Sequence, residues 1–288
     1  MYYGIILFAV ALFGFQFYFN GLYQKEAGSS LFSSFFLSCT SGVVGAISLS
    51  VLNGISFSTT PFTIIMAFLN ALIGLAFTFF AIKALGKINL SLFSVFSMLG
   101  GMVLPFVAGI IFYKEPLTVA KIICFCLIVL ALGFTVDRNT KDKKGSIYYI
   151  GVFILNGMAA VFSMIYSNSS FEKESANAYS FQTAVIRVLI ALIVIVLLKK
   201  PSLKMQVVHT KKMWVAIVFC GFLGTIANYL LLIALKHIQG SIQYSLVTGG
   251  VMIASTLIGF FTDKKPTVKN IVSVVVSTLA MLSLLLPI

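Results

Sequence analysis

Only one fully charged side chain lies well inside a long apolar run of this sequence. Arg187 stands in the stretch QTAVIRVLIALIVIVL, with apolar residues on both sides. A buried arginine costs several kcal/mol on insertion scales, so it must face protein, water or a bound partner. Two roles suit it. Its planar fork could bind a carboxylate or phosphate of a ligand. Alternatively its role is structural: it could donate hydrogen bonds to backbone carbonyls of a neighbouring broken helix, or extend its apolar stem so that the charged head reaches a polar region.

The other groups that commonly do chemistry lie at the ends of apolar runs or carry no recognisable spacing. His209 and His237 fall between runs, and the four cysteines show no CxxC pair or metal-ligand spacing. We therefore expect no enzymatic activity, no metal site and no cofactor. The seven acidic residues all stand at or beyond the ends of the runs: Glu26, Glu115, Asp137, Asp142, Glu172, Glu174 and Asp263.

The elements that must position Arg187 are membrane helices. Of the 288 residues, 60% are hydrophobic and 9% are charged, whereas a soluble domain has roughly a quarter charged residues. A helix needs about 20 apolar residues to cross a bilayer, and barrel strands would be shorter and would alternate. We predict an all-α membrane protein with ten spans: 3–22, 31–52, 62–82, 88–112, 119–136, 147–168, 179–198, 213–235, 241–261 and 268–287.

An internal repeat relates the two halves of the chain. When the sequence is shifted by 150 positions, residues 84–116 and 234–266 share nine identities without a gap, among them Gly100 with Gly250 and Pro116 with Pro266. Each unit has five helices, an odd number, so the second must enter the membrane from the opposite side. The prediction is therefore two inverted five-helix repeats, 1–140 and 141–288, as in many secondary transporters.

The repeated residues resemble a known family. The pattern AL-x-K-I-x-x-S, the glycine-containing fourth helix and the turn Lys114-Glu115-Pro116-Leu117-Thr118 resemble the ten-helix, two-repeat (EamA-like) branch of the drug/metabolite transporter superfamily. Phe13-Gly14 occupies the place of that family's Trp-Gly, and Arg187 matches an arginine often found in the second helix of a unit. The second half departs from the pattern, with Lys265 in place of the glutamate. The resemblance implies transport but not a particular solute.

Lysine and arginine are distributed unevenly between the two predicted faces of the bundle. The odd-numbered loops hold fifteen of them and the even-numbered loops hold four, Lys114, Lys121, Lys173 and Lys236. Since such residues favour the cytoplasmic side, we predict a plasma-membrane protein with cytoplasmic odd-numbered loops and both termini outside. Relatives of the kind named above usually have both termini inside. The net charge of +13 is expected to face lipid headgroups rather than nucleic acid.

Polar residues inside the spans mark the predicted binding site. They occur in both repeats, some at equivalent positions, which suits a cavity at the repeat interface near the membrane midplane, although any one of them could instead join two helices. Spans 5 and 10 are nearly free of them and are interpreted as packing or homodimer surfaces. The predicted site residues are Gln16, Asn20, Thr78, Phe79, Asn156, Ser163, Tyr166, Arg187, Asn228, Tyr229, Gln243 and Tyr244. Two glycine pairs, Gly100-Gly101 and Gly249-Gly250, and Pro105 are expected to weaken helices 4 and 9 near midspan, or to pack closely.

These patterns predict a secondary transporter of a small polar or amphipathic metabolite or drug-like solute, working by alternating access. The alternative is a membrane-embedded protein that modifies or translocates lipid. A lipid-modifying enzyme would need carboxylate, histidine or serine clusters at the membrane face, and the predicted loops hold mainly lysine. We therefore favour transport.

Overall fold

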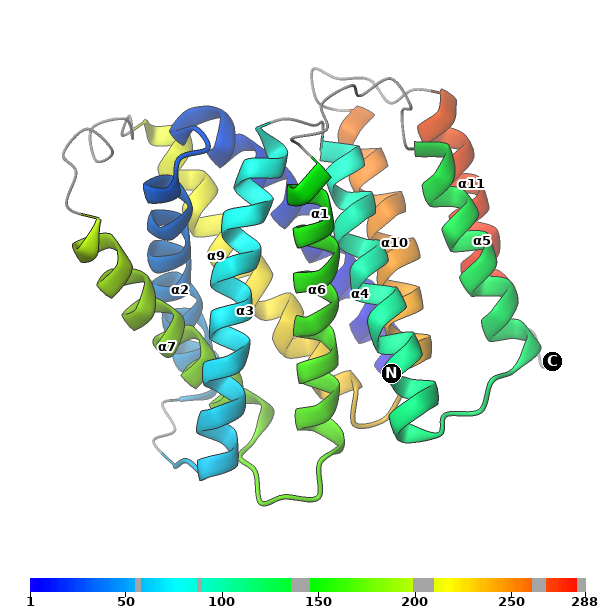
Figure 1. The fold of residues 1–288 in the computed structure, drawn as a ribbon, viewed down its shortest axis with the longest axis horizontal. Coiled ribbons are helices and arrows are strands. Elements are labelled where there is room, and N and C mark those ends of the chain that lie inside the picture. The colour runs from blue at the N-terminus through cyan, green and yellow to red at the C-terminus, as the bar shows by residue number, and fades with distance from the viewer. Residues whose placement is uncertain (55–57, 87–89, 136–145, 199–209, 261–267, 284–288) are drawn as a thin grey trace.

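The computed structural model describes residues 1–54, 58–86, 90–135, 146–198, 210–260 and 268–283. Within these ranges all regular structure is α-helical, and no strand is present (Figure 1). The helices run in alternating directions along one another. They are α1 (Tyr2–Ala27), α2 (Leu31–Asn53), α3 (Pro61–Leu85), α4 (Leu90–Tyr113), α5 (Val119–Thr135), α6 (Ser146–Asn168), α7 (Ala176–Leu197), α9 (Lys211–Ala234), α10 (Gly240–Phe260) and α11 (Val268–Ser283).

Eight of these helices are long and apolar enough to cross a membrane, counting only the described residues. They are α1 to α4, α6, α7, α9 and α10. At about 1.5 Å per residue, the 25 residues of α3 extend well beyond the ~30 Å of a hydrocarbon core. Helix α5 contains a shorter apolar stretch, Val119–Ala131. The protein is thus a helical bundle compatible with multiple membrane passes.

Helix ends follow local signals more than the ends of the apolar runs. Ser30, Thr60, Ser175 and Thr210 each accept a hydrogen bond from the backbone N–H three residues later, which satisfies one of the unpaired donors at a helix start. Helix α1 continues past the predicted end at residue 22 and includes Glu26. It stops at Gly28, whose φ of 72° suits glycine in particular.

The helices pack in pairs that link the first five with the last five. Helix α1 lies against α9 and α10, and α6 lies against α3 and α4. Helix α2 packs on α7, α4 on α10, and α5 on α11. In Figure 1 the α5–α11 pair stands at one edge of the bundle and α2 and α7 at the other. Of the eight long helices, α10 is the most enclosed and α7 the least.

The glycine pairs serve close packing and do not break their helices. Helix α4 is continuous from Leu90 to Tyr113 through Gly100 and Pro105, and α10 is continuous from Gly240 to Phe260. A Cβ on Gly100 would overlap the backbone carbonyl of Phe153 in α6. Small residues at such points allow helices to approach closely. Neither helix is therefore broken at its glycines in this structure, and the contact at Gly100 agrees with the packing alternative.

Candidate functional site

A cavity of about 220 Å³ lies among helices of both halves of the chain. Side chains from α1, α2, α3 and α4 line it together with side chains from α6, α7, α9 and α10, whereas no described residue of α5 or α11 does. Eight of the predicted site residues line this cavity: Gln16, Asn20, Thr78, Asn156, Ser163, Arg187, Asn228 and Tyr244.

Four predicted site residues, Phe79, Tyr166, Tyr229 and Gln243, do not line this cavity. Phe79 and Tyr229 directly follow the lining residues Thr78 and Asn228. Since successive residues of a helix are about 100° apart, both rings turn away from the cavity. Phe79 meets Phe80 edge to face, and Tyr229 packs against a neighbouring apolar cluster.

Tyr166 and Gln243 are buried structural residues. The hydroxyl of Tyr166 donates to the backbone carbonyl of Glu174 at 2.8 Å, and its ring stacks on Tyr179. Gln243 is fully buried and donates from Nε2 to the carbonyl of Leu231 at 2.9 Å, which joins α10 to α9. Both are polar residues that connect helices, the commoner role for such groups inside a bundle.

The structure adds lining residues that the predicted set lacks. The start of α7 contributes Tyr179, Ser180 and Thr183, and α3 contributes Asn70. A signal for two of them exists in the sequence. Ser180 and Thr183 lie seven and four positions before Arg187, so all three share one helix face. The amide of Asn70 donates to the hydroxyl of Tyr179 at 2.8 Å and thereby joins α3 to α7.

Among the described residues, Arg187 is the only charged one that lines the cavity. Its guanidinium lies over Gly74 of α3, where a Cβ would come within 2.6 Å of Nη2. The buried Nε has no hydrogen-bond partner. In the part of the chain that the structure describes, no backbone carbonyl accepts a hydrogen bond from this guanidinium, so the carbonyl-capping role is not the one this geometry favours. Tyr179 lines the same cavity.

Gln16 of α1 has a similar environment in the other half of the cavity wall. Its Oε1 is buried without a hydrogen-bond partner. Its amide lies over Gly224 of α9, where a Cβ would overlap Nε2. Gly74 and Gly224 are 150 positions apart, the spacing of the sequence repeat. Two equivalent glycines thus leave space for two polar side chains that both line the cavity.

The remaining amides of the cavity have protein partners. Asn156 donates from Nδ2 to the carbonyl of Ser97 at 2.6 Å, between α6 and α4. Asn228 donates to the carbonyl of Gly224, one turn earlier in its own helix, at 2.8 Å. The oxygen of Asn20 accepts from the Cys220 thiol at 3.2 Å. Among the described lining residues, the buried polar atoms without a partner are therefore those of Arg187 and Gln16.

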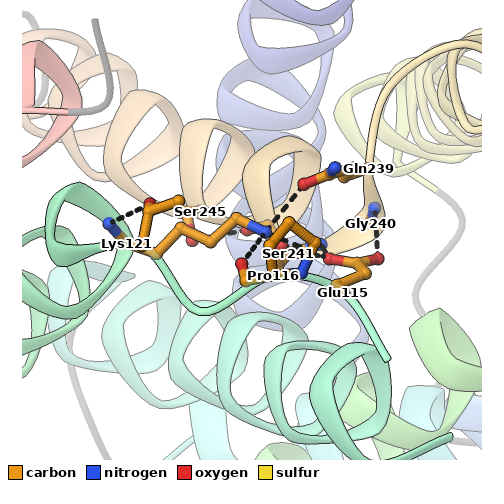
Figure 2. Close-up of polar contacts among 8 residues, drawn as sticks. Glu115, Pro116, Lys121, Gln239, Gly240, Ser241 and Ser245 are labelled. Carbon is orange, nitrogen blue, oxygen red and sulfur yellow. Dashed lines mark hydrogen bonds and ion pairs between the residues drawn. The ribbon is translucent and has the colours of Figure 1, made fainter. Parts of the chain in front are cut away.

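A second polar cluster joins the turn between α4 and α5 to the start of α10 (Figure 2). The Glu115 carboxylate accepts hydrogen bonds from the backbone N–H groups of Gly240 at 3.1 Å and Ser241 at 3.3 Å, and from the Ser241 hydroxyl. It therefore caps the N-terminus of α10, where a negative charge is favourable. Lys121 lies 3.5 Å from the same carboxylate. Its ammonium donates to Gln239 Oε1 at 2.7 Å and to the Pro116 carbonyl at 3.0 Å.

The same end of the bundle holds a third group of contacts. Thr60 donates to the carbonyl of Glu172 at 3.0 Å, and the Glu174 N–H donates to Thr63 at 3.1 Å, so the start of α3 is bound to the connection between α6 and α7. Lys173 lies in that connection, and burial, followed by the nearby charge of Lys236, lowers the pKa of its ammonium group. At this end, elements from both halves are thus joined by direct contacts.

Comparison with known proteins shows that a solved structure shares the fold of this chain. No family model and no curated protein matches this chain. A solved structure described only as "Crystal structure of protein" is similar with a TM-score of 0.70 at 16% sequence identity, over 97% of this chain and 94% of that chain. In the part of the chain that the structure describes, no group of three His, Cys, Asp or Glu is placed to hold a metal ion.

Proposed function

We propose that this protein is a secondary transporter for a small polar or amphipathic solute in the plasma membrane. The observation that carries the proposal is the cavity, which is lined by eight helices drawn equally from the two halves and contains unpartnered polar atoms. Small-molecule sites between helices are typically enclosed and have a few polar groups. Transporters place such a site at the interface of their repeats.

The pairing of helices supports two inverted repeats with ten spans. If α1 corresponds to α6, α2 to α7, α3 to α9, α4 to α10 and α5 to α11, a two-fold axis converts the α1–α9 contact into α6–α3 and the α1–α10 contact into α6–α4. All four contacts are present. The same axis maps α2–α7, α4–α10 and α5–α11 onto themselves, and these are also present.

Individual residues support the same relation. Thr60 and Thr210, 150 positions apart, both cap the start of a helix. Tyr23 and Tyr166 both lie in the last turns of their helices, and each donates at 2.8 Å to a backbone carbonyl shortly before or within the first turn of the next helix. The two tyrosines bind at opposite ends of the bundle, as an inverted repeat requires.

Alternating access would then be a change at the two ends around a fixed cavity. At the end that carries Glu115, α10 contacts the α4–α5 turn and α3 contacts the α6–α7 connection, and in the proposed mechanism these contacts close it. In the proposed orientation this is the extracellular end, because the loops on this side hold few lysines. Opening it requires those contacts to separate.

Transport by purified full-length protein in liposomes tests the proposal. A panel of radiolabelled amino acids, organic acids, amines and sugars should include at least one solute taken up faster than by protein-free liposomes. Asn228→Leu should reduce that uptake at least tenfold, because its amide lines the cavity while its hydrogen bond stays within α9.

The matched control is Thr278→Val in α11. Thr278 also donates to a carbonyl one turn earlier in its own helix, but it is exposed and distant in sequence from any lining residue. We expect wild-type uptake from it. Equal loss in both variants, or redistribution of labelled phospholipid between leaflets with no solute uptake, would reject the proposal, and the second result would favour the lipid-translocating alternative.

A further inference from the structure

We propose that the cavity binds a small organic anion that also carries a hydrogen-bond donor, with Arg187 holding the anionic group and Gln16 accepting from the donor. The inference rests on the proposed function for its biological meaning, but it concerns binding and can be tested without transport. It goes beyond transport of a polar solute because it assigns the charge and the hydrogen-bonding pattern of the ligand.

The charge of the ligand follows from the composition of the wall. Arg187 contributes a positive charge, and the described lining residues include no aspartate, glutamate or second cation. An arginine is rarely kept inside a membrane protein without a partner, because an uncompensated charge there is costly. The contacts of its guanidinium are incomplete, since Nε is buried and unpaired. A carboxylate or phosphate would complete them with two parallel hydrogen bonds.

The position of the guanidinium is determined by Gly74. A side chain at position 74 would occupy the space in which the guanidinium lies, since a Cβ there would be 2.6 Å from Nη2 and 3.0 Å from Cζ. Glycine here brings the backbone of α3 against the flat face of the arginine. The fork is thereby held at the cavity wall without being neutralised, which is the arrangement expected of a binding group.

The donor on the ligand follows from Gln16. Its Oε1 is a buried acceptor with no partner, and leaving such an atom unsatisfied costs free energy. A ligand atom that carries a hydrogen, such as a hydroxyl or an ammonium, would satisfy it. Because Gln16 lies over Gly224 and Arg187 over Gly74, the two groups come from different halves of the cavity wall. A ligand held by both groups would contact both repeats.

The cavity limits the size of the ligand. Its volume of about 220 Å³ lies below the roughly 300–1,000 Å³ typical of pockets for drug-sized ligands. A hydroxy acid or amino acid of a few carbon atoms fits this space, as does a small phosphate ester.

Binding can be measured with defined probes on the full-length protein in detergent. L-lactate supplies the anion and the hydroxyl, lactamide removes the charge, propionate removes the hydroxyl, and glycerol 3-phosphate replaces the carboxylate with a phosphate. We expect saturable thermal stabilisation by lactate at matched ionic strength, weaker stabilisation by propionate and none by lactamide. Comparison of lactate with glycerol 3-phosphate then distinguishes the two anionic groups.

Variants identify the residues responsible. Arg187→Gln should weaken lactate binding by about 10- to 150-fold, the range for loss of hydrogen bonds to a charged group, and Arg187→Lys should weaken it less. Gly74→Ala keeps the charge but displaces the guanidinium, so it should also weaken lactate binding. This variant tests the inference if Arg187→Gln fails to fold. Gln16→Leu should reduce the preference for lactate over propionate while both still bind.

The results separate the inference from the proposed function. The inference is overturned if neither anion stabilises the wild type beyond an equal concentration of chloride, if lactamide binds as well as lactate, or if Arg187→Gln and Gly74→Ala both bind lactate as the wild type does. If anions bind through Arg187 and no solute of the liposome panel is transported, the inference is supported and the transport proposal fails.

Discussion

The carboxylate of Glu115 is expected to hold the closed end of the bundle together, and Glu115→Gln is the change that tests it. The substitution preserves the shape of the side chain. It removes the charge and replaces one acceptor oxygen by an NH₂ group that faces the N–H groups or hydroxyl at the start of α10. It also leaves Lys121 without its ion-pair partner.

The magnitude can be worked from the exposure of the pair. The side chains of Lys121 and Glu115 are 3% and 9% exposed, so solvent screens the pair little. Removing one member of a buried pair costs about 3–5 kcal/mol. Lys121 keeps its bonds to Gln239 and Pro116, which places the expected loss near the lower limit, about 3 kcal/mol. At roughly 2–4 °C per kcal/mol for a chain of this size, the melting temperature should fall by roughly 6–12 °C.

The assay is thermal unfolding of purified protein in one detergent, with Lys114→Gln as the matched control. Lys114 is exposed and adjacent to Glu115, and its backbone has a φ of 51°. Lysine and glutamine at this position must both adopt that φ, so Lys114→Gln should have the melting temperature of the wild type. In the double variant Glu115→Gln/Lys121→Met, the loss should be smaller than the sum of the single losses, since no unpaired charge remains. A melting temperature of Glu115→Gln within about 2 °C of wild type, or strictly additive losses, would refute the reasoning.

Two further expectations concern packing and orientation. Gly100→Ala should prevent folding or lower the melting temperature by more than about 10 °C, because the new Cβ would overlap the carbonyl of Phe153 and force α4 away from α6. The control Gly133→Ala has open space around it and should be neutral or slightly stabilising. Equal changes in melting temperature for the two variants would contradict the packing of α4 on α6. In a cysteine-free background, Met205→Cys should resist an impermeant thiol reagent on intact cells and Glu172→Cys should react, and the opposite pattern would reverse the proposed orientation.

The helical nature of the protein follows from the sequence because it depends on local properties. Long apolar runs must satisfy their backbone hydrogen bonds internally in a membrane, and only helices do so within one segment. The predicted spans therefore coincide with the helices to within a few residues, except where a local signal takes over. The end of α1 is such a case, since the helix continues through Glu26 and stops at Gly28.

The candidate site was predictable to the level of the helix but not of the helix face. The sequence identifies Thr78 and Asn228 as polar residues in apolar helices, and it makes Phe79 and Tyr229 equally plausible as cavity residues. Which of two neighbours faces the cavity depends on the rotation of each helix about its axis. That rotation is decided by packing against helices remote in the sequence, at contacts such as Gly100 with Phe153.

The environment of Arg187 is decided only by the tertiary structure. Its position within an apolar run establishes that the charge needs a partner, because burying an ion is costly wherever the helix packs. The sequence does not say that Gly74, more than 100 positions earlier, lies beneath the guanidinium, nor that Gly224 does the same for Gln16. The repeat makes these glycines equivalent, but only the packing of α3 on α7 and of α1 on α9 brings each one against a polar side chain of another helix. Close contacts of this kind depend on the shapes of both partners, which no single segment of the chain contains.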